Sequence, residues 1–248
     1  MNTFVVETRQ LTKRYGDRAA VKDLTLTVER GEVFGFLGHN GAGKTTTIHM
    51  LTTLLKPTSG TALVCGKSVT EQSLQARRHI GYVPENVRLY DTMTARANLL
   101  FFARLSGVEN PERRIDETLD FLECRDLAPR LVGSFSKGLR QRIGLAQAIL
   151  HRPDVLFLDE PTSGLDPMGI KTLRDLIIRL NREFGTTIFM NTHLISEISR
   201  TCTSIGVLNQ GELVFRDTID KVTQRYGSES SLEELYLSVT PVQVKGAA

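Results

Sequence analysis

The sequence predicts an α/β fold in which buried parallel strands alternate with helices. An apolar run at residues 32–37 leads into a glycine-rich loop, and a helical pattern follows over residues 45–55. A second apolar run, at residues 155–158, is continuous, which is typical of a strand buried on both faces. Further short apolar runs lie at residues 61–65, 80–83, 187–190 and 204–208. Because helical segments separate most of these runs, a parallel sheet is the expected arrangement.

The remaining elements define the expected domain organisation. Leu24, Leu26 and Val28 alternate with polar residues, which indicates a half-buried strand. Strand signals are absent between residues 85 and 134, where helices are predicted at 95–105 and 111–122. Two more helices are predicted, one at 137–150 and one that carries an apolar stripe of Ile170, Leu173, Leu176, Ile177 and Leu180. We therefore expect one domain over residues 1–238, a helical subdomain at about 86–135, and a flexible tail at 239–248.

Composition narrows the class of protein. The chain has 248 residues, 40% of them hydrophobic, which is enough to bury a sizeable core. The net charge of +3 is too small to indicate binding to nucleic acid. The three cysteines are scattered without metal-ligand spacing, as expected for free thiols in a reducing compartment. No apolar run approaches the ~18 residues that a membrane-spanning helix requires.

The loop between residues 37 and 47 fits the phosphate-binding pattern G-x-x-x-x-G-K-[ST]. It consists of Gly38, His39, Asn40, Gly41, Ala42, Gly43, Lys44, Thr45 and Thr46. Glycines let the backbone approach a phosphate chain closely, and the amides at the start of the following helix point toward it as donors. Lys44 supplies a positive charge to the terminal phosphates, and Thr45 supplies a hydroxyl to a bound Mg²⁺. A glycine-rich surface loop is the alternative, which the strand and helix on either side disfavour.

A second chemical centre follows the apolar run at 155–158, where Asp159 and Glu160 are adjacent. Carboxylates at the end of a buried strand are costly unless a cation or a catalytic task holds them there. In a parallel sheet this position faces the same crevice as the glycine-rich loop. We expect Asp159 to hold Mg²⁺ and Glu160 to orient the water that attacks the terminal phosphate. Since Pro161 and Thr162 come next, a simple turn is the alternative interpretation.

Together with residues 159–166, the loop resembles the nucleotide-binding subunit of ATP-binding cassette (ABC) transporters. The resemblance extends over residues 4–237 and rests on six motifs in the family's order. It implies a P-loop NTPase core with a mixed sheet, an N-terminal antiparallel β subdomain and an inserted α-helical subdomain.

The resemblance also implies roles for individual residues. Tyr15 stands where the family stacks an aromatic side chain on adenine. Ser136 and Gly138 lie in the segment that matches the signature loop, which in the family contacts the γ-phosphate bound to the opposite subunit. His193 matches the switch histidine that reaches the γ-phosphate, although a lone histidine is more often structural. Glu85 stands where most members have a glutamine, and a carboxylate there is still able to coordinate Mg²⁺.

Two further departures point to one branch of the family. Lys137 and Leu139 stand where glycine and glutamine are usual in the signature loop. Similar substitutions occur in the ATPases that serve ABC-2 type exporters, and residues 231–237 also resemble that branch.

The function implied is an ATPase that powers a separate integral membrane permease. Its cofactors are ATP and Mg²⁺, and its place is peripheral, on the cytoplasmic face of the membrane. One phosphate loop and one signature loop per chain imply a homodimer that clamps two ATP molecules. A non-transport ABC-type ATPase acting on DNA or ribosomes is one alternative, disfavoured because long coiled coils and a basic surface are missing. A regulatory or assembly module that binds ATP without turnover is another, disfavoured by the presence of Glu160 and His193.

Overall fold

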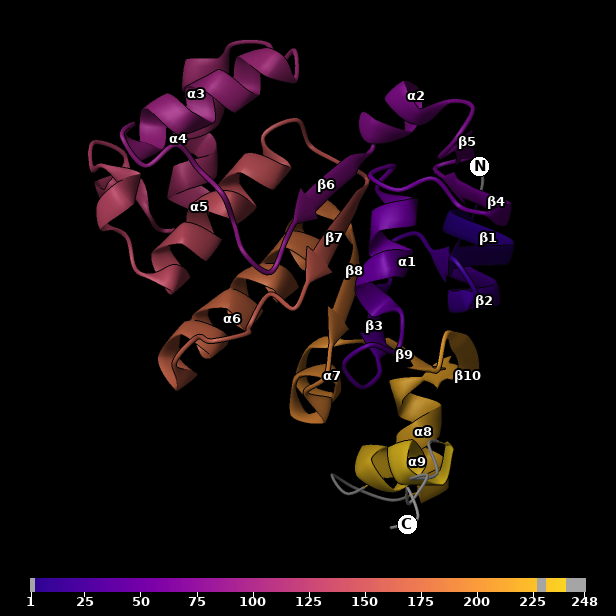
Figure 1. The fold of residues 1–248 in the computed structure, drawn as a ribbon. Coiled ribbons are helices and arrows are strands. Elements are labelled where there is room, and N and C mark those ends of the chain that lie inside the picture. The colour runs from indigo at the N-terminus through magenta and orange to yellow at the C-terminus, as the bar shows by residue number, and fades with distance from the viewer. Residues whose placement is uncertain (1–2, 227–230, 240–248) are drawn as a thin grey trace.

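The computed structural model describes residues 3–226 and 231–239, which form two sheets with helices around them (Figure 1). The larger sheet has the strand order β10-β9-β3-β8-β7-β6. Its members are β3 (Val33–Leu37), β6 (Ile80–Val83), β7 (Val155–Asp159), β8 (Thr187–Thr192), β9 (Ser204–Asn209) and β10 (Glu212–Thr218). All neighbouring pairs are parallel except β9 and β10. The mixed sheet is therefore confirmed, with β10 as an additional strand that the apolar pattern did not indicate.

The strands at the centre of this sheet are mostly apolar, because both of their faces are covered. Every residue of β3, β7 and β8 is buried. Their carboxyl ends lie side by side, as the pairs Leu37↔Thr192 and Asp159↔Asn191 show. Polar residues at these positions therefore converge on one edge of the sheet.

The smaller sheet is antiparallel, with the order β2-β1-β4-β5. Its strands are β1 (Phe4–Tyr15), β2 (Arg18–Glu29), β4 (Ser59–Val64) and β5 (Lys67–Ser68). Helix α1 (Lys44–Leu51) lies between the two sheets in Figure 1, and its Ile48 and Met50 join one buried cluster with Phe34 and Phe36 of β3. The N-terminal antiparallel β subdomain is thereby confirmed.

Helix α1 is shorter than the residues 45–55 predicted from sequence. It ends at Leu51, and Thr53 has a left-handed backbone with φ 65°. The amides of Leu54 and Leu55 both donate to the carbonyl of His49, which closes the last turn. Leu54 and Leu55 continue the apolar pattern of the sequence, but they lie in the turn after the helix.

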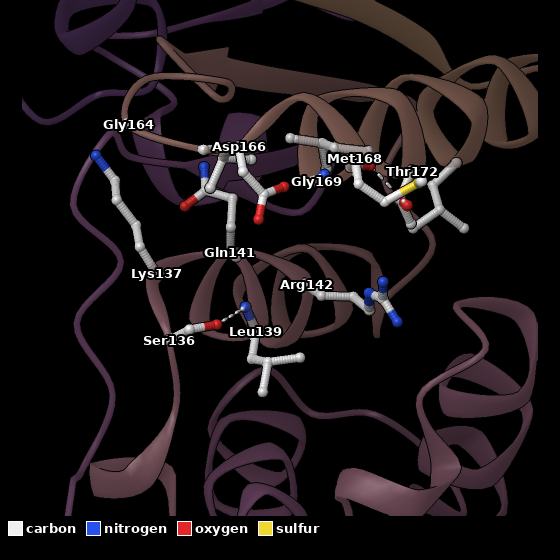
Figure 2. Close-up of a pocket in the computed structure, with 14 residues that line it drawn as sticks. Ser136, Lys137, Leu139, Gln141, Arg142, Gly164, Asp166, Met168, Gly169 and Thr172 are labelled. Carbon is white, nitrogen blue, oxygen red and sulfur yellow. Dashed lines mark hydrogen bonds between the residues drawn. The ribbon is translucent and has the colours of Figure 1, made fainter.

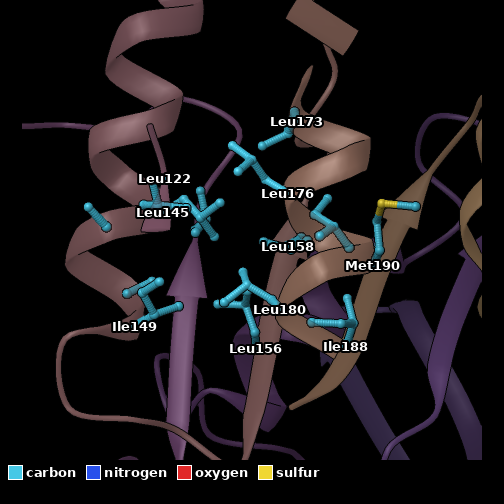
Figure 3. Packing of buried hydrophobic residues seen from close by; sticks show 14 of the residues in the cluster. Leu122, Leu145, Ile149, Leu156, Leu158, Leu173, Leu176, Leu180, Ile188 and Met190 are labelled. Carbon is cyan, nitrogen blue, oxygen red and sulfur yellow. The ribbon is translucent and has the colours of Figure 1, made fainter. Parts of the chain in front are cut away.

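The opposite face of the larger sheet is covered by α6 (Pro167–Phe184). Leu173, Leu176 and Leu180 of α6 belong to one buried cluster with strand residues that include Leu156 and Ile188 (Figure 3). Four residues of the predicted apolar stripe are thus part of the core, and the fifth, Ile170, is only partly buried and lies outside this cluster. Short helices α2 (Ser73–Arg77), α7 (Ile195–Thr201), α8 (Ile219–Tyr226) and α9 (Ser231–Val239) complete the surroundings of the sheets.

Three helices gather beyond the β6 edge: α3 (Ala95–Leu105), α4 (Pro111–Phe121) and α5 (Lys137–Ile149) (Figure 1). Helix α3 has the bounds predicted from sequence, because Thr94 caps its first turn by accepting a hydrogen bond from the Ala97 amide at 3.1 Å. Two 3₁₀ turns, Arg125–Leu127 and Val132–Ser134, connect α4 to α5. The inserted helical segment is confirmed as helical. The predicted tail overlaps α9 at Val239 only, and residues 240–248 lie outside the described residues.

The two sheets are tied by a polar cluster at the amino ends of the parallel strands. The two carboxylate oxygens of Asp154 accept hydrogen bonds from Arg30 at 2.6 Å and from His79 at 2.7 Å. Together, Cys65, His79 and Asp154 bring potential metal-ligating atoms within 4.8 Å of one another. Both carboxylate oxygens of Asp154 are already engaged by Arg30 and His79, however. We therefore interpret this cluster as an ion-pair network.

None of the helices in the described part of the chain has the length and apolar character that a membrane span requires.

Candidate active site

The glycine-rich loop connects β3 to α1 and runs close to two neighbouring chain segments. Gly43 has φ 109°, and a Cβ added there would lie 2.3 Å from the Ala20 carbonyl oxygen. A Cβ added at Gly38 would lie 2.5 Å from the Leu208 carbonyl oxygen. Only glycine fits these two positions without moving the backbone. The conformation needed for a phosphate cradle is therefore already built into the strand–loop–helix unit.

Lys44, the first residue of α1, folds back over the loop. Its buried ammonium donates to the Gly38 carbonyl at 2.7 Å and to the His39 carbonyl at 3.3 Å. It also lies 3.4 Å from Oε1 of Glu160. A buried ammonium requires such partners, and the cation consequently sits between the phosphate loop and the acidic pair.

The acidic pair meets α1 at the carboxyl edge of the sheet. Thr45 Oγ1 donates to Oδ1 of Asp159 at 2.9 Å. Glu160 has a left-handed backbone with φ 47°, and its Oε2 lies 2.8 Å from Nδ1 of His193. Tyr82 of β6 is a further neighbour of Asp159. Its burial, and to a smaller extent the charge of Asp159, raise the pKa of its hydroxyl above the ordinary value, so Tyr82 stays neutral. The structure thus brings together Lys44, Thr45, Asp159, Glu160 and His193, as the sequence-based interpretation requires.

Asn191 is a residue of this site that the sequence reasoning missed. Its Nδ2 donates to Oδ1 of Asp159 at 2.6 Å, and its Oδ1 accepts from the Glu160 amide at 2.6 Å. The side chain is fully buried at the end of β8. Asparagine directly after the apolar run 187–190 was the available signal, since a polar side chain in a buried strand requires partners.

A cavity of about 470 Å³ opens in front of the loop. Its lining residues are Tyr15, Arg18, Ala20, Asn40, Gly41, Gly43, Lys44, Thr45, Thr46, Glu85 and Glu160. Tyr15 is 53% exposed at its rim, and Glu85 accepts a hydrogen bond from Ser163 Oγ at 2.9 Å. Arg18 and Ala20 were not singled out from sequence. Gly38, His39 and Ala42 shape the loop without lining the cavity; the His39 ring bonds to the Asn40 carbonyl at 2.8 Å instead.

Ser136 and Gly138 lie elsewhere, in a separate cavity of about 430 Å³ between α5 and the start of α6 (Figure 2). Ser136 caps α5, since its Oγ accepts from the Leu139 amide at 3.4 Å. The two cavities share no lining residue. Within one chain, the segment that resembles the signature loop therefore does not meet the phosphate loop.

One atom of this second cavity lacks a partner. Gln141 is buried, and its Nε2 has no hydrogen-bond partner among the residues that the structure describes. In Figure 2 its side chain points toward Asp166 on the loop before α6. The nitrogen itself is buried, where an unsatisfied donor is costly.

The residues at the mouth of α1 also suit a hard cation. Thr45 contributes a hydroxyl, and Asp159 and Glu85 contribute carboxylates, all of them oxygen ligands. Mg²⁺ prefers oxygen donors and is commonly held by one or two carboxylates together with substrate phosphates. The donor set present therefore fits this ion.

Fold and site together define a nucleoside triphosphate-binding α/β protein. The protein-family model that matches residues 21–163 is described as "ABC transporter". The chain is 42% identical to the "Bacitracin transport ATP-binding protein BcrA" of Bacillus licheniformis over 89% of its own length and 72% of the relative's. This chain belongs to the ABC transporter family as an ATP-binding subunit, an ATPase that energises transport.

Solved structures agree. One, titled "Structure of ATP binding subunit of ABC transporter", superposes with a TM-score of 0.84 at 29% identity, covering 95% of this chain and 99% of the other. A second is a dimeric ATP-binding cassette in a post-hydrolysis state bound to ADP and Pi. It has a TM-score of 0.78 at 25% identity and covers 86% of this chain and 98% of the other. The fold predicted from sequence and the family resemblance are both confirmed.

Proposed function

We propose that two copies of this chain clamp two Mg²⁺-ATP molecules in their shared interface and thereby drive an integral membrane permease, in the manner of an ABC-2 type exporter. The observation that carries this proposal is the division of the site into two halves. One half is the cavity with Lys44 and Glu160, and the other is the cavity with Ser136 and Gly138. Because the halves are apart in one chain, a second copy is needed to close each site.

ATP binding rests on the phosphate loop and Lys44. When nucleotide binds, its phosphates would replace the Gly38 and His39 carbonyls as hydrogen-bond acceptors of the Lys44 ammonium. The loop amides would donate to the phosphate oxygens. Tyr15 at the rim offers an aromatic face for the adenine. Thr45, Asp159 and Glu85 would hold Mg²⁺, which when bound offsets the negative charge of the phosphates.

Hydrolysis requires a base close to the terminal phosphate. Glu160 is placed for this task between the Lys44 ammonium at 3.4 Å and the His193 ring at 2.8 Å. The carboxylate accepts a proton from the attacking water. His193, which is more exposed, lies on the solvent side of Glu160 and is able to contact the γ-phosphate.

Closure by the second copy brings Ser136 and Gly138 to the phosphates bound by the first. Ser136 is the N-cap of α5, a 13-residue helix whose first amides are suitable donors to an anion.

The surface around α3 is the proposed contact with the permease. Tyr90 is 49% exposed, Phe101 is 42% exposed and Leu105 is 74% exposed. The rings of Tyr90 and Phe101 stack edge to face with centroids 5.3 Å apart. An exposed apolar patch of this kind is typical of a binding surface, and its use here would hold the protein peripherally at the cytoplasmic face of the membrane. No nucleic-acid partner is proposed, because the net charge of the chain is only +3.

The test compares the wild-type chain with Glu160→Gln and with Glu183→Gln, an exposed control on α6. We expect Glu160→Gln to lower steady-state ATP turnover by about 10²–10⁴-fold, as for removal of a general base, and to keep ATP affinity. With turnover blocked, light scattering should show an ATP-dependent dimer. Normal turnover by Glu160→Gln would refute the role of Glu160. A monomer with saturating Mg²⁺-ATP, even with the permease present, would refute the clamp. A wild-type complex that binds ATP without turnover would favour the regulatory module.

A further inference from the structure

The acidic pair at the end of β7 is held by a side chain from the neighbouring strand. In the parallel register Asp159 lies opposite Asn191, so their side chains project on the same face of the sheet. The Asn191 amide bridges the pair: Nδ2 donates to Oδ1 of Asp159 at 2.6 Å, and Oδ1 accepts from the backbone amide of Glu160 at 2.6 Å.

The second of these bonds falls at a strained point. Glu160 has φ 47°, a left-handed conformation that non-glycine residues seldom adopt and that persists only when surrounding contacts hold it. The backbone carbonyl of Asn191 also accepts from the Glu160 amide, but at 3.3 Å. The side-chain oxygen is closer, and it is therefore the principal acceptor at this turn.

The first bond shares its acceptor with α1. Oδ1 of Asp159 accepts both from Asn191 and from Thr45 Oγ1, the latter at 2.9 Å. Two donors on one oxygen fix the rotation of the carboxylate. Since Asn191 is fully buried, solvent water is excluded from replacing it.

We propose that Asn191 is a positioning residue of the ATPase site, which orients the Asp159 carboxylate for the metal and holds the strained backbone that aims Glu160 at the terminal phosphate. This inference rests on the proposed function, because it takes Asp159 and Glu160 as the groups that act. An amide suits the position because it presents one donor and one acceptor side by side. Leucine has neither, and serine is too short to reach both partners.

The experiment uses Asn191→Leu, Asn191→Ser and the matched controls Asn181→Leu and Asn181→Ser. Asn181 also makes two side-chain bonds, to the Gly31 and Thr186 carbonyls at 2.8 and 3.0 Å, but at the opposite ends of the strands. Three quantities are measured: kcat, the Kd of a fluorescent ATP analogue, and the Mn²⁺ affinity in the presence of a non-hydrolysable ATP analogue by electron paramagnetic resonance. Thermal unfolding identifies any variant that is not folded, and the serine variants serve if the leucine variants do not fold.

For the Asn191 variants we expect kcat to fall at least about tenfold and Mn²⁺ affinity to weaken about tenfold, as when a residue that orients a metal ligand is removed. The Kd of the ATP analogue should stay within about threefold, because the phosphate loop and Lys44 are unchanged. A purely structural role would lower kcat and weaken the binding of both the ATP analogue and Mn²⁺ together. The Asn181 variants should show that pattern if they are destabilised.

Glu160→Gln is measured in the same assays to separate two kinds of failure. If it turns over ATP normally, the catalytic role that the proposed function gives to Glu160 is wrong. If it is inactive while both folded Asn191 variants keep kcat and Mn²⁺ affinity within about twofold of wild type, the proposed function stands and the role of Asn191 is refuted.

Discussion

Lys44 has contacts in the structure that the sequence motif does not predict. The motif predicts a cation for the terminal phosphates, and the structure shows the same cation bonded to loop carbonyls and next to Glu160. Nucleotide phosphates would therefore displace existing contacts of Lys44 instead of meeting an exposed charge. The ion pair also keeps the Glu160 side chain near the loop.

We predict that Lys44→Ala weakens ATP binding by at least about tenfold, the loss expected when a charge-assisted contact of about 1.4 kcal/mol or more is removed. Isothermal titration calorimetry measures the dissociation constant. Lys221→Ala, in which a largely exposed lysine of α8 is removed, serves as the control and should bind ATP normally. An unchanged dissociation constant for Lys44→Ala would show that the loop amides alone provide the affinity.

At the scale of single elements, the ends of a helix could be predicted from neighbouring residues where a capping residue was present. Helix α3 begins after Thr94, whose hydroxyl accepts from the Ala97 amide, and it ends before Gly107, which has φ 68°. Both signals are local, so the sequence was sufficient to predict the bounds. Helix α1 lacks such a stop signal, and its end at Leu51 depends on the turn formed by the residues that follow.

We predict that Thr94→Ala destabilises the protein by about 1 kcal/mol, because the Ala97 amide loses its acceptor. Urea denaturation measures the change in the free energy of unfolding. Thr94→Ser keeps a hydroxyl at the same position and should retain most of the stability. Equal losses in the two variants would mean that packing of the threonine methyl group, and not the cap, accounts for the effect.

At the scale of the whole molecule, the ion-pair network around Asp154 joins the turn after β2 to the start of β7. Burial alone would raise the pKa of Asp154, but the hydrogen bonds from Arg30 and His79 outweigh it and hold the pKa below the ordinary value of 3.8. A carboxyl group with a lowered pKa stabilises the fold above its unfolded-state pKa. That contribution is lost as the pH falls through the folded-state pKa, here below about 3.8.

We predict that Arg30→Ala raises the pKa of Asp154. Burial raises this pKa, and the variant lacks the hydrogen bond from Arg30 that opposes the effect of burial. The part of the acid-induced loss of stability that comes from Asp154 should therefore shrink, because that loss requires a folded-state pKa below the unfolded-state value. At pH 7 the cost should be about 0.5–1 kcal/mol, since Arg30 is half exposed and the pair is screened by solvent. Unfolding curves between pH 3 and 7 measure both effects. Superimposable pH profiles for variant and wild type would exclude Arg30 as the cause of the shift.

How far the sequence predicts the site depends on the separation of its parts along the chain. Lys44 and Thr45 belong to one contiguous motif, and Asp159 and Glu160 end one buried strand, so a local pattern was enough to find them. Asn191 was not found, because its partner Asp159 is 32 residues away and only the β7–β8 register brings the two side chains together. The same holds for Arg18 and Ala20, which reach the cavity through the antiparallel sheet.

The amino-acid sequence by itself determined the class of protein. The phosphate loop, the buried strands and the acidic pair each consist of consecutive residues, so each can be recognised from the sequence alone. Only the tertiary structure decided what surrounds those residues. It placed Ser136 and Gly138 in a cavity apart from Lys44, and it set Asn191 between Asp159 and Glu160. The physical reason is that contacts between distant segments depend on strand order and register, which arise from packing of the whole chain and have no local signature.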